Sequence, residues 1–149
     1  MLNFDLTFKK KVMTSQFIKW KKEYNTGISI IDEQHQRLVE MINELYDSFM
    51  KKEHKDKVKD IIKEMSAYTY KHFKTEERFF DMYGYSGKED HVQEHQKFMK
   101  KVCEFQEMLV ENKTSLTFKV LSFLQEWLLR HIGESDQKYV VELKRAGLT

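Results

Sequence analysis

The sequence has no proline and only five glycines among its 149 residues. Both residue types interrupt helices, proline most strongly, so their scarcity favours long helices over strands and tight turns. The chain also has a single cysteine, Cys103, which excludes a disulfide framework and a cluster of thiolate metal ligands. Any metal site must therefore be built from other side chains.

An excess of charge of one sign is also missing. Lysine, arginine, aspartate and glutamate make up 34% of the residues, yet the formal net charge at pH 7 is only +2. Such a balance provides no basic field for nucleic acid, and the short basic runs at residues 9–11 and 51–52 are typical of a solvated surface. We therefore expect no nucleic-acid partner.

Long apolar runs are absent as well. No stretch approaches the roughly 20 apolar residues of a membrane span, and the N-terminus lacks the apolar segment of a signal peptide. The sequence therefore predicts a cytoplasmic protein without a membrane span. Residues 1–16 precede the periodic part of the chain, and we interpret them as an N-terminal extension open to contact with a protein partner.

The rest of the sequence shows helical periodicity in four segments, at about residues 33–49, 57–80, 88–110 and 116–132. Inward residues recur there at spacings of three and four, the pattern of a helix with one buried face. The connections are short, which makes consecutive helices antiparallel neighbours. This predicts an all-α, up-down-up-down antiparallel four-helix bundle over residues 17–149, with a short C-terminal helical tail at about 135–145.

Polar residues predict where two of these helices begin. Asp32 is expected to cap the first helix, because a carboxylate there accepts hydrogen bonds from free backbone N–H groups. Ser86 and Glu89 have the spacing of a capping box before the third helix.

Five of the six histidines fall at inward positions of these segments. One buried histidine is usually a core residue with satisfied hydrogen bonds, but five imidazoles in one bundle are costly to desolvate unless something binds them. The sixth, His54, lies in a polar run between two segments and is expected to be exposed. The inward histidines are His35, His72, His91, His95 and His131.

Three of these histidines have a partner one helical turn away. His72 and Glu76 are four residues apart, as are His91 and His95, so each pair projects from one face of its helix. This spacing allows two side chains of one helix to reach a common metal centre. His35 comes from the first helix alone.

The fourth segment brings His131 and, five residues later, Asp136. On a continuous α-helix this spacing separates two side chains by about 140°. Gly133 lies between them, and we expect the helix to end or bend there so that Asp136 returns to the site.

Five histidines and two carboxylates are too many ligands for one ion, so two ions are implied. Two bridging carboxylates and a solvent-derived oxo or hydroxo bridge, with the histidines divided three and two, leave one ion six-coordinate and the other five-coordinate. The open position would accept a small ligand. Imidazole and carboxylate without thiolate fit iron, with manganese or zinc as lesser options.

The motifs that contain these residues resemble those of bacterial hemerythrin domains. The matching stretches are YNTGI at 24–28, IDEQH at 31–35, HFKTEE at 72–77, HVQEH at 91–95 and WLLRHI at 127–132, followed by Asp136. The resemblance covers most of the chain, from about Phe17 to Arg145. Each motif alone is weak, but the combination is highly specific.

The resemblance implies a di-iron centre with an assigned set of ligands. By position, the six-coordinate iron would be held by His91, His95 and His131, and the five-coordinate iron by His35 and His72, with Glu76 and Asp136 bridging both. The resemblance also implies that dioxygen binds at the open position.

Two carboxylates and five imidazoles favour oxygen carriage, because di-iron oxygenases are typically richer in carboxylates. We therefore expect reversible dioxygen binding for transport, storage or delivery, and not an enzyme. An apolar oxygen pocket is predicted from four residues that by their spacing would ordinarily be simple core. They are Phe73, Trp127, Leu128 and Ile132.

Other interpretations remain open. Hemerythrin-like di-iron sites also serve oxygen, redox or nitric oxide sensing or detoxification, and a weak peroxidase or nitric oxide activity is compatible with the sequence. Residues 91–95 also match the His-x-x-Glu-His pattern of some zinc proteases, with Glu94 as the base. A string of five residues arises easily by chance, and the helix pattern leaves Glu94 on another, solvated face. Glu94 is alternatively a candidate acceptor for an imidazole N–H.

Overall fold

A computed structural model describes residues 16–111 and 117–149 of the chain. Nearly all of the N-terminal extension predicted at residues 1–16, and most of the connection between the third and fourth helices, therefore lie outside the described residues.

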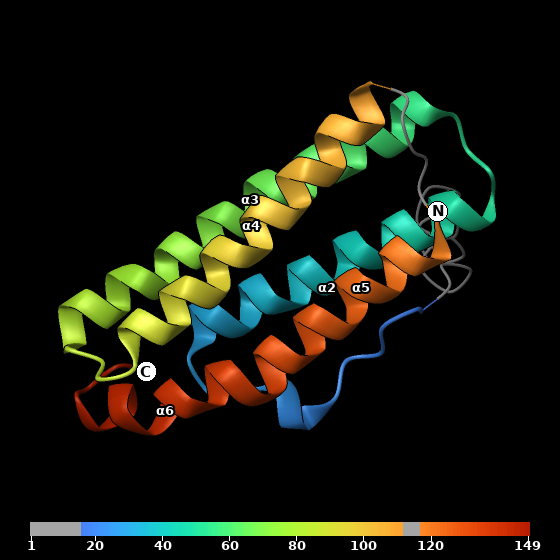
Figure 1. Cartoon of the computed structure of the whole chain (residues 1–149). Coiled ribbons are helices and arrows are strands. Elements are labelled where there is room, and N and C mark those ends of the chain that lie inside the picture. Colours follow the sequence, from blue (N-terminus) through green and yellow to red (C-terminus); the bar gives the residue numbers. More distant parts are fainter. Residues whose placement is uncertain (1–15, 112–116) are drawn as a thin grey trace, which may run out of the picture.

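All the secondary-structure elements of the described residues are helices, and the long helices run antiparallel to their neighbours in sequence (Figure 1). A short 3-10 helix, η1 (Lys22–Tyr24), precedes them. The long helices are α2 (Ser29–Met50), α3 (Lys55–Tyr83), α4 (Lys88–Val110) and α5 (Phe118–Arg130). The predicted all-α, up-down-up-down four-helix bundle is confirmed.

A π-helical segment, η2 (His131–Ser135), and a final helix, α6 (Asp136–Arg145), continue directly from α5. Figure 1 shows α6 lying beside the turn that joins α3 to α4. None of the described helices is long and apolar enough to cross a membrane.

The predicted caps at Asp32 and Ser86 are wrong. Because α2 begins before Asp32, this carboxylate lies inside the helix and accepts hydrogen bonds from the backbone N–H groups of Thr26 and Gly27 at 2.7 and 3.0 Å. Ser86 precedes α4 without capping it. Its backbone N–H and its hydroxyl each bind the Glu142 carboxylate of α6 at 2.7 Å, which fastens α6 to the α3–α4 turn.

α3 begins two residues earlier than predicted because His54 caps it. The Nδ1 atom of His54 accepts a hydrogen bond from the backbone N–H of Asp56 at 3.2 Å. As predicted, His54 is exposed. The other end of α3 stops at Gly84, whose φ of 66° lies in the left-handed region that glycine adopts without strain.

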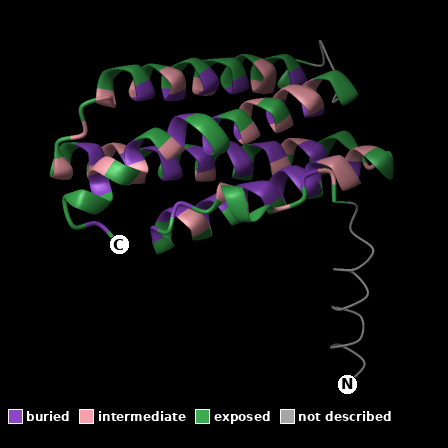
Figure 2. Ribbon diagram, turned by 90° about the horizontal axis from the view of Figure 1, so that it is seen from below, coloured by how far each residue is buried: buried purple, intermediate pink, exposed green. Residues whose placement is uncertain are grey.

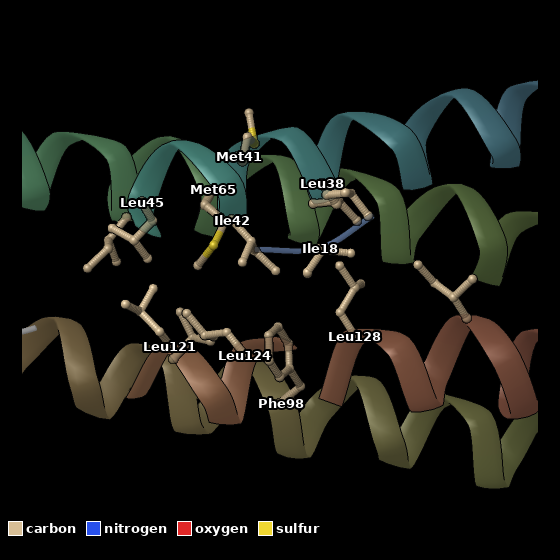
Figure 3. Close-up of a cluster of buried hydrophobic side chains, with 14 of the residues drawn as sticks. Ile18, Leu38, Met41, Ile42, Leu45, Met65, Phe98, Leu121, Leu124 and Leu128 are labelled. Atoms are coloured by element: carbon tan, nitrogen blue, oxygen red, sulfur yellow. The ribbon is translucent and has the colours of Figure 1, made fainter. Parts of the chain in front are cut away.

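Figure 2 shows the buried residues, in purple, mainly on the faces that the helices turn toward one another. Buried apolar side chains form two clusters. The larger one, called here the main core, runs along the bundle between the long helices. Figure 3 shows Ile42 and Leu45 of α2 pointing toward Leu121 and Leu124 of α5. The smaller one, called the terminal cluster, lies where α6 meets the start of α2 and the end of α3. It consists of Ile28, Ile31, Phe80, Tyr139, Leu143 and Leu148.

Candidate metal centre

The seven candidate ligands lie together at the end of the bundle nearest α6, and none is more than 4% exposed. Histidine and carboxylate are buried there because they occupy the same inward stripe of each helix as the apolar core residues. The candidate ligands are His35 of α2, His72 and Glu76 of α3, His91 and His95 of α4, His131 of η2 and Asp136 of α6.

Their ligand atoms form two groups, in each of which all atoms lie within 4.8 Å of one another and are placed to hold a metal ion. The first, called the three-histidine cluster, contains Glu76, His91, His95 and His131. The second, called the two-histidine cluster, contains His35, His72, Glu76 and Asp136. The histidines are thus divided as the hemerythrin resemblance implies, and Glu76 belongs to both groups.

Asp136 also faces both clusters, with a different oxygen on each side. Its Oδ2 lies 2.9 Å from Nε2 of His35. Its Oδ1 lies 3.0 Å from the Nε2 atoms of both His91 and His131. One carboxylate oxygen toward each group of imidazoles is the arrangement needed to bridge two ions.

Glu76 is placed differently. Its Oε1 lies 3.2 Å from Nε2 of His72 and 3.2 Å from Nε2 of His95, so a single oxygen faces both clusters. Its Oε2 accepts a hydrogen bond of 2.5 Å from the Tyr139 hydroxyl. The two shared carboxylates therefore do not present their oxygens in the same way.

Asp136 reaches the site through a π-helical turn. The expected end or bend at Gly133 is wrong, because the helix continues and the backbone N–H of Asp136 binds the carbonyl of His131, five residues earlier. This i→i+5 bond widens the turn, so residues five apart come to the same face. The return of Asp136 to His131 is as predicted, but its cause is one extra residue in the turn.

Several ligand atoms in this site are buried without a hydrogen-bond partner in the described part of the chain. They are Nδ1 and Nε2 of His35, Nε2 of His72, Oε1 of Glu76, and Oδ1 and Oδ2 of Asp136. Leaving a buried polar group unpaired costs about 1–3 kcal/mol. All but His35 Nδ1 converge on the space between the clusters, where metal ions would satisfy them.

The three-histidine cluster gives a second indication that these residues fit a metal ion. His95 and His131 each direct Nδ1 at a carboxylate, so in the neutral rings Nδ1 has the proton and Nε2 presents a lone pair. The two Nε2 atoms nevertheless lie 3.1 Å apart. Two facing lone pairs repel unless a cation lies between them. Two ligands at right angles on one ion, each at about 2.1 Å, are about 3.0 Å apart, which matches this spacing.

The charge of the site leads to the same conclusion. Burial disfavours ionisation of Asp136, but the neighbouring His131, together with the close imidazoles of His35 and His91, holds the pKa of Asp136 well below the ordinary value. Burial likewise disfavours protonation of His131, yet Asp136 and Glu94 raise its pKa to about 10. The buried carboxylates thus require positive charge nearby. Without metal a proton on an imidazole supplies it, and a bound metal ion would take the place of that proton.

Other side chains hold the imidazoles from behind. Glu77 Oε2 lies 2.9 Å from Nδ1 of His95, and Glu94 Oε2 lies 3.2 Å from Nδ1 of His131. Gln34 Oε1 lies 2.7 Å from Nδ1 of His72. Such partners fix the ring orientation and raise the basicity of the ligand.

The predicted alternative role of Glu94 as an imidazole acceptor matches this contact. The Glu94 side chain is 44% exposed, so it is partly solvated, as predicted, and it also contacts His131. The zinc-protease interpretation does not fit. Glu94 contacts Nδ1 of His131, whereas the other ring nitrogen, Nε2, faces the cluster. A general base would have to reach the cluster itself.

The sequence interpretation missed Gln34, Glu77 and Tyr139. Gln34 and Glu77 each adjoin a candidate ligand in the chain, and their long side chains reach around to a neighbouring helix. Tyr139 follows Asp136 by three residues on α6, a spacing that places both on one helical face and that could have identified it.

Aromatic rings cover the three-histidine cluster. The ring of Phe73 stacks on His95 at a centroid distance of 3.8 Å, and Trp127 stacks on His131 at 4.5 Å. Leu128 and Ile132 are buried in the main core along the same helical stretch. Of the four residues predicted as an oxygen pocket, Phe73, Leu128 and Ile132 are thus buried core residues and Trp127 is partly buried against the core. Phe73 and Trp127 directly contact candidate ligands.

The chain is similar to several known proteins. Residues 26–143 match the profile of the family described as hemerythrin HHE cation binding domain. The chain is 36% identical over 121 residues to a bacteriohemerythrin of Pseudomonas aeruginosa, covering 81% of this chain and 78% of that protein. It is 33% identical to a bacteriohemerythrin of Clostridium acetobutylicum, covering 81% and 97%. A crystal structure of wild-type hemerythrin aligns with a TM-score of 0.81 at 24% identity, covering 85% of this chain and 98% of that one.

Proposed function

The chain belongs to the hemerythrin HHE cation-binding family, and we propose that it binds dioxygen reversibly at a non-haem di-iron centre, as an oxygen carrier, store or delivery protein. The observation that supports this proposal most strongly is the convergence of buried, unpaired ligand atoms in two adjacent clusters. Two irons bound there would supply the electrons that dioxygen takes up on binding and returns on release.

The two clusters support an assignment of ligands to each iron. His91, His95 and His131 would bind one ion, and His35 and His72 the other. Asp136 directs one oxygen to each side and would bridge the ions, together with Glu76 and a solvent-derived oxo or hydroxo group. The ion with two histidines has one protein ligand fewer, so its open position is where a small ligand would bind.

The surroundings of the site favour carriage over oxidation of a substrate. Five neutral imidazoles and two carboxylates donate less negative charge than a carboxylate-rich oxygenase site. Phe73, Trp127, Leu128 and Ile132 would exclude the water and protons that promote irreversible oxidation of the iron. Tyr139 and the partners behind the imidazoles hold the ligands in place when the small molecule enters or leaves.

An absorption experiment on the reduced protein tests this function. The iron-loaded, reduced chain is recorded without oxygen, then in air, and again after oxygen has been removed. We expect two irons per chain and a visible charge-transfer band that appears with oxygen and disappears on its removal. Immediate decay of the band would favour sensing or redox chemistry at the same site, and a protein without bound iron would refute the proposal.

A pair of variants tests the apolar pocket. Leu128→Asn introduces a polar side chain beside the site, so we expect faster autoxidation of the oxygenated form. Leu124→Asn is the matched control: it is equally buried on the same helix, but it lies one turn farther from His131 and lines a cavity with Ile62 and Phe105. An autoxidation rate that rises equally in both variants would remove Leu128 from the pocket.

A further inference from the structure

The hydrogen-bond partners behind the two clusters differ in charge. In the three-histidine cluster, two imidazoles donate from Nδ1 to carboxylates, His95 to Glu77 at 2.9 Å and His131 to Glu94 at 3.2 Å. A carboxylate that accepts the Nδ1–H hydrogen bond increases the electron density at Nε2, the atom that faces the cluster. Each carboxylate also adds negative charge close to the cation position.

Both carboxylates are themselves held in place. Glu77 is 15% exposed, and its other oxygen binds the Lys74 ammonium at 3.1 Å. Glu94 is 44% exposed, and its Oε2 lies 3.2 Å from Nδ1 of His131, whose side chain is 3% exposed. These contacts place one carboxylate oxygen against the Nδ1 atom of each imidazole.

The two-histidine cluster has only neutral groups in the same position. His72 donates from Nδ1 to the amide oxygen of Gln34 at 2.7 Å, and the Gln34 amide nitrogen donates to the Thr75 hydroxyl at 3.2 Å. Nδ1 of His35 has no hydrogen-bond partner among the described residues. These imidazoles are therefore weaker donors, and no additional negative charge supports the cation.

From this difference we propose that the two metal positions fill in a fixed order, which Glu77 and Glu94 set. The three-histidine cluster takes the first divalent ion and holds it tightly, and the two-histidine cluster takes a second ion that exchanges readily. This inference rests on the proposed di-iron site. When iron is scarce, the protein would therefore hold a single ion in the three-histidine cluster. The two-histidine cluster, which has the open position, would be empty.

The order can be measured by titrating the metal-free protein with cobalt(II) under anaerobic conditions, following calorimetry and the visible absorption of bound cobalt. We expect two steps of one ion each, with the first at least about tenfold tighter than the second. His35→Ala should abolish the second step and retain the first. His91→Ala should weaken the first step instead.

Glutamate-to-glutamine variants remove the charge of the two carboxylates behind the imidazoles but keep the shape of the side chain. Glu94→Gln and Glu77→Gln should each weaken the first step by about 10–100-fold, the usual effect of losing such a partner, with little change in the second. Glu107→Gln, an exposed glutamate on α4, is the control and should change neither step. Circular dichroism of each metal-free variant confirms that it is folded.

The reciprocal change gives an independent test. Gln34→Glu places a carboxylate behind His72, so it should strengthen the second step relative to the first. Two ions that bind with equal affinity, or an order that none of these variants alters, would overturn the inference and leave the proposed function intact. A metal-free protein that binds no cobalt at all would contradict the proposed function itself.

Discussion

The main core and the terminal cluster differ in how they contact the metal centre. The main core is built mostly from aliphatic side chains, and it reaches the candidate ligands only at one end, through residues such as Phe73. The terminal cluster is small, yet its Tyr139 binds Glu76 and its Phe80 packs edge-on against His91 at 4.9 Å. One cluster mainly provides buried apolar volume, whereas the other also positions ligands.

This difference predicts that stability and metal binding are separable in the main core and coupled in the terminal cluster. α6 is the reason for the coupling, because it contributes Asp136 to the site and both Tyr139 and Leu143 to the terminal cluster. Variants placed in the two regions test whether this separation holds.

The largest effect is expected where α6 enters the metal centre. Asp136→Ala removes the carboxylate that faces both clusters, so the purified variant should lose most of its iron. His54→Ala, at an exposed helix cap, should retain the iron content of the unchanged protein. Iron analysis of the two purified variants decides this, and equal iron content would refute the assignment of Asp136.

A second pair compares the clusters directly. Leu143 in the terminal cluster and Leu121 in the main core are both 0% exposed. Either leucine-to-alanine change should lower the free energy of unfolding of the metal-free protein by about 2–5 kcal/mol, because it leaves a cavity. Only Leu143→Ala should also reduce the additional stability that bound metal confers, since α6 then holds Asp136 and Tyr139 less firmly.

Urea unfolding with and without cobalt(II) measures both quantities for each leucine variant. The comparison between clusters fails if the metal-dependent increment falls equally in Leu121→Ala and Leu143→Ala.

A smaller effect is expected from the hydrogen bond that joins Tyr139 of the terminal cluster to Glu76 of the site. Tyr139→Phe removes the hydrogen bond to Glu76, so the metal-loaded protein should lose about 1.5–3 kcal/mol of stability, the usual contribution of a bond to a charged group. Burial and the charge of Glu76 raise the pKa of Tyr139 well above its ordinary value. The hydroxyl therefore stays protonated, and the loss should be constant across neutral pH.

Thermal unfolding of the cobalt-loaded protein at several pH values measures this loss. The matched control is Tyr70→Phe on the exposed face of α3, which should change stability by less than about 0.5 kcal/mol. A Tyr139→Phe variant as stable as this control would show that the hydrogen bond does not support Glu76.

The sequence predicted the bundle and the inward positions of the candidate ligands because both depend on the same three- and four-residue spacing. His72 and Glu76 illustrate this, since a regular helix alone places them on one face. Gln34 and Glu77 could not be predicted in the same way. Their contacts depend on how far neighbouring helices are separated and on side-chain conformations, which the periodicity does not determine.

Asp136 lies between these two cases. Its spacing from His131 conflicts with an α-helix, so the sequence indicated that the backbone must change between them. It did not indicate the kind of change, because a π-turn needs no special residue and is selected by the contacts that it permits. Gly133 therefore suggested a bend that the structure does not have.

The smallest effect is expected at Gly133 itself. This glycine is exposed, its φ is not positive, and an added Cβ would meet nothing within 4 Å. If the contacts of Asp136 maintain the π-turn, Gly133→Ala should leave metal binding unchanged and raise stability by up to about 1 kcal/mol, because alanine favours helical backbone. Loss of bound cobalt in this variant would instead show that the turn requires glycine.

Gly84→Ala is the matched control for that change. A Cβ at Gly84 also meets nothing within 4 Å, but its φ of 66° is left-handed, a conformation that costs alanine about 1–2 kcal/mol. An added Cβ is thus unobstructed at both positions, but only Gly84 has a left-handed backbone, so the midpoint of thermal unfolding should shift in opposite directions in the two variants. A destabilised Gly133→Ala beside an equally destabilised Gly84→Ala would mean that the π-turn, like the end of α3, depends on the conformational freedom of its glycine and not on the metal centre that it serves.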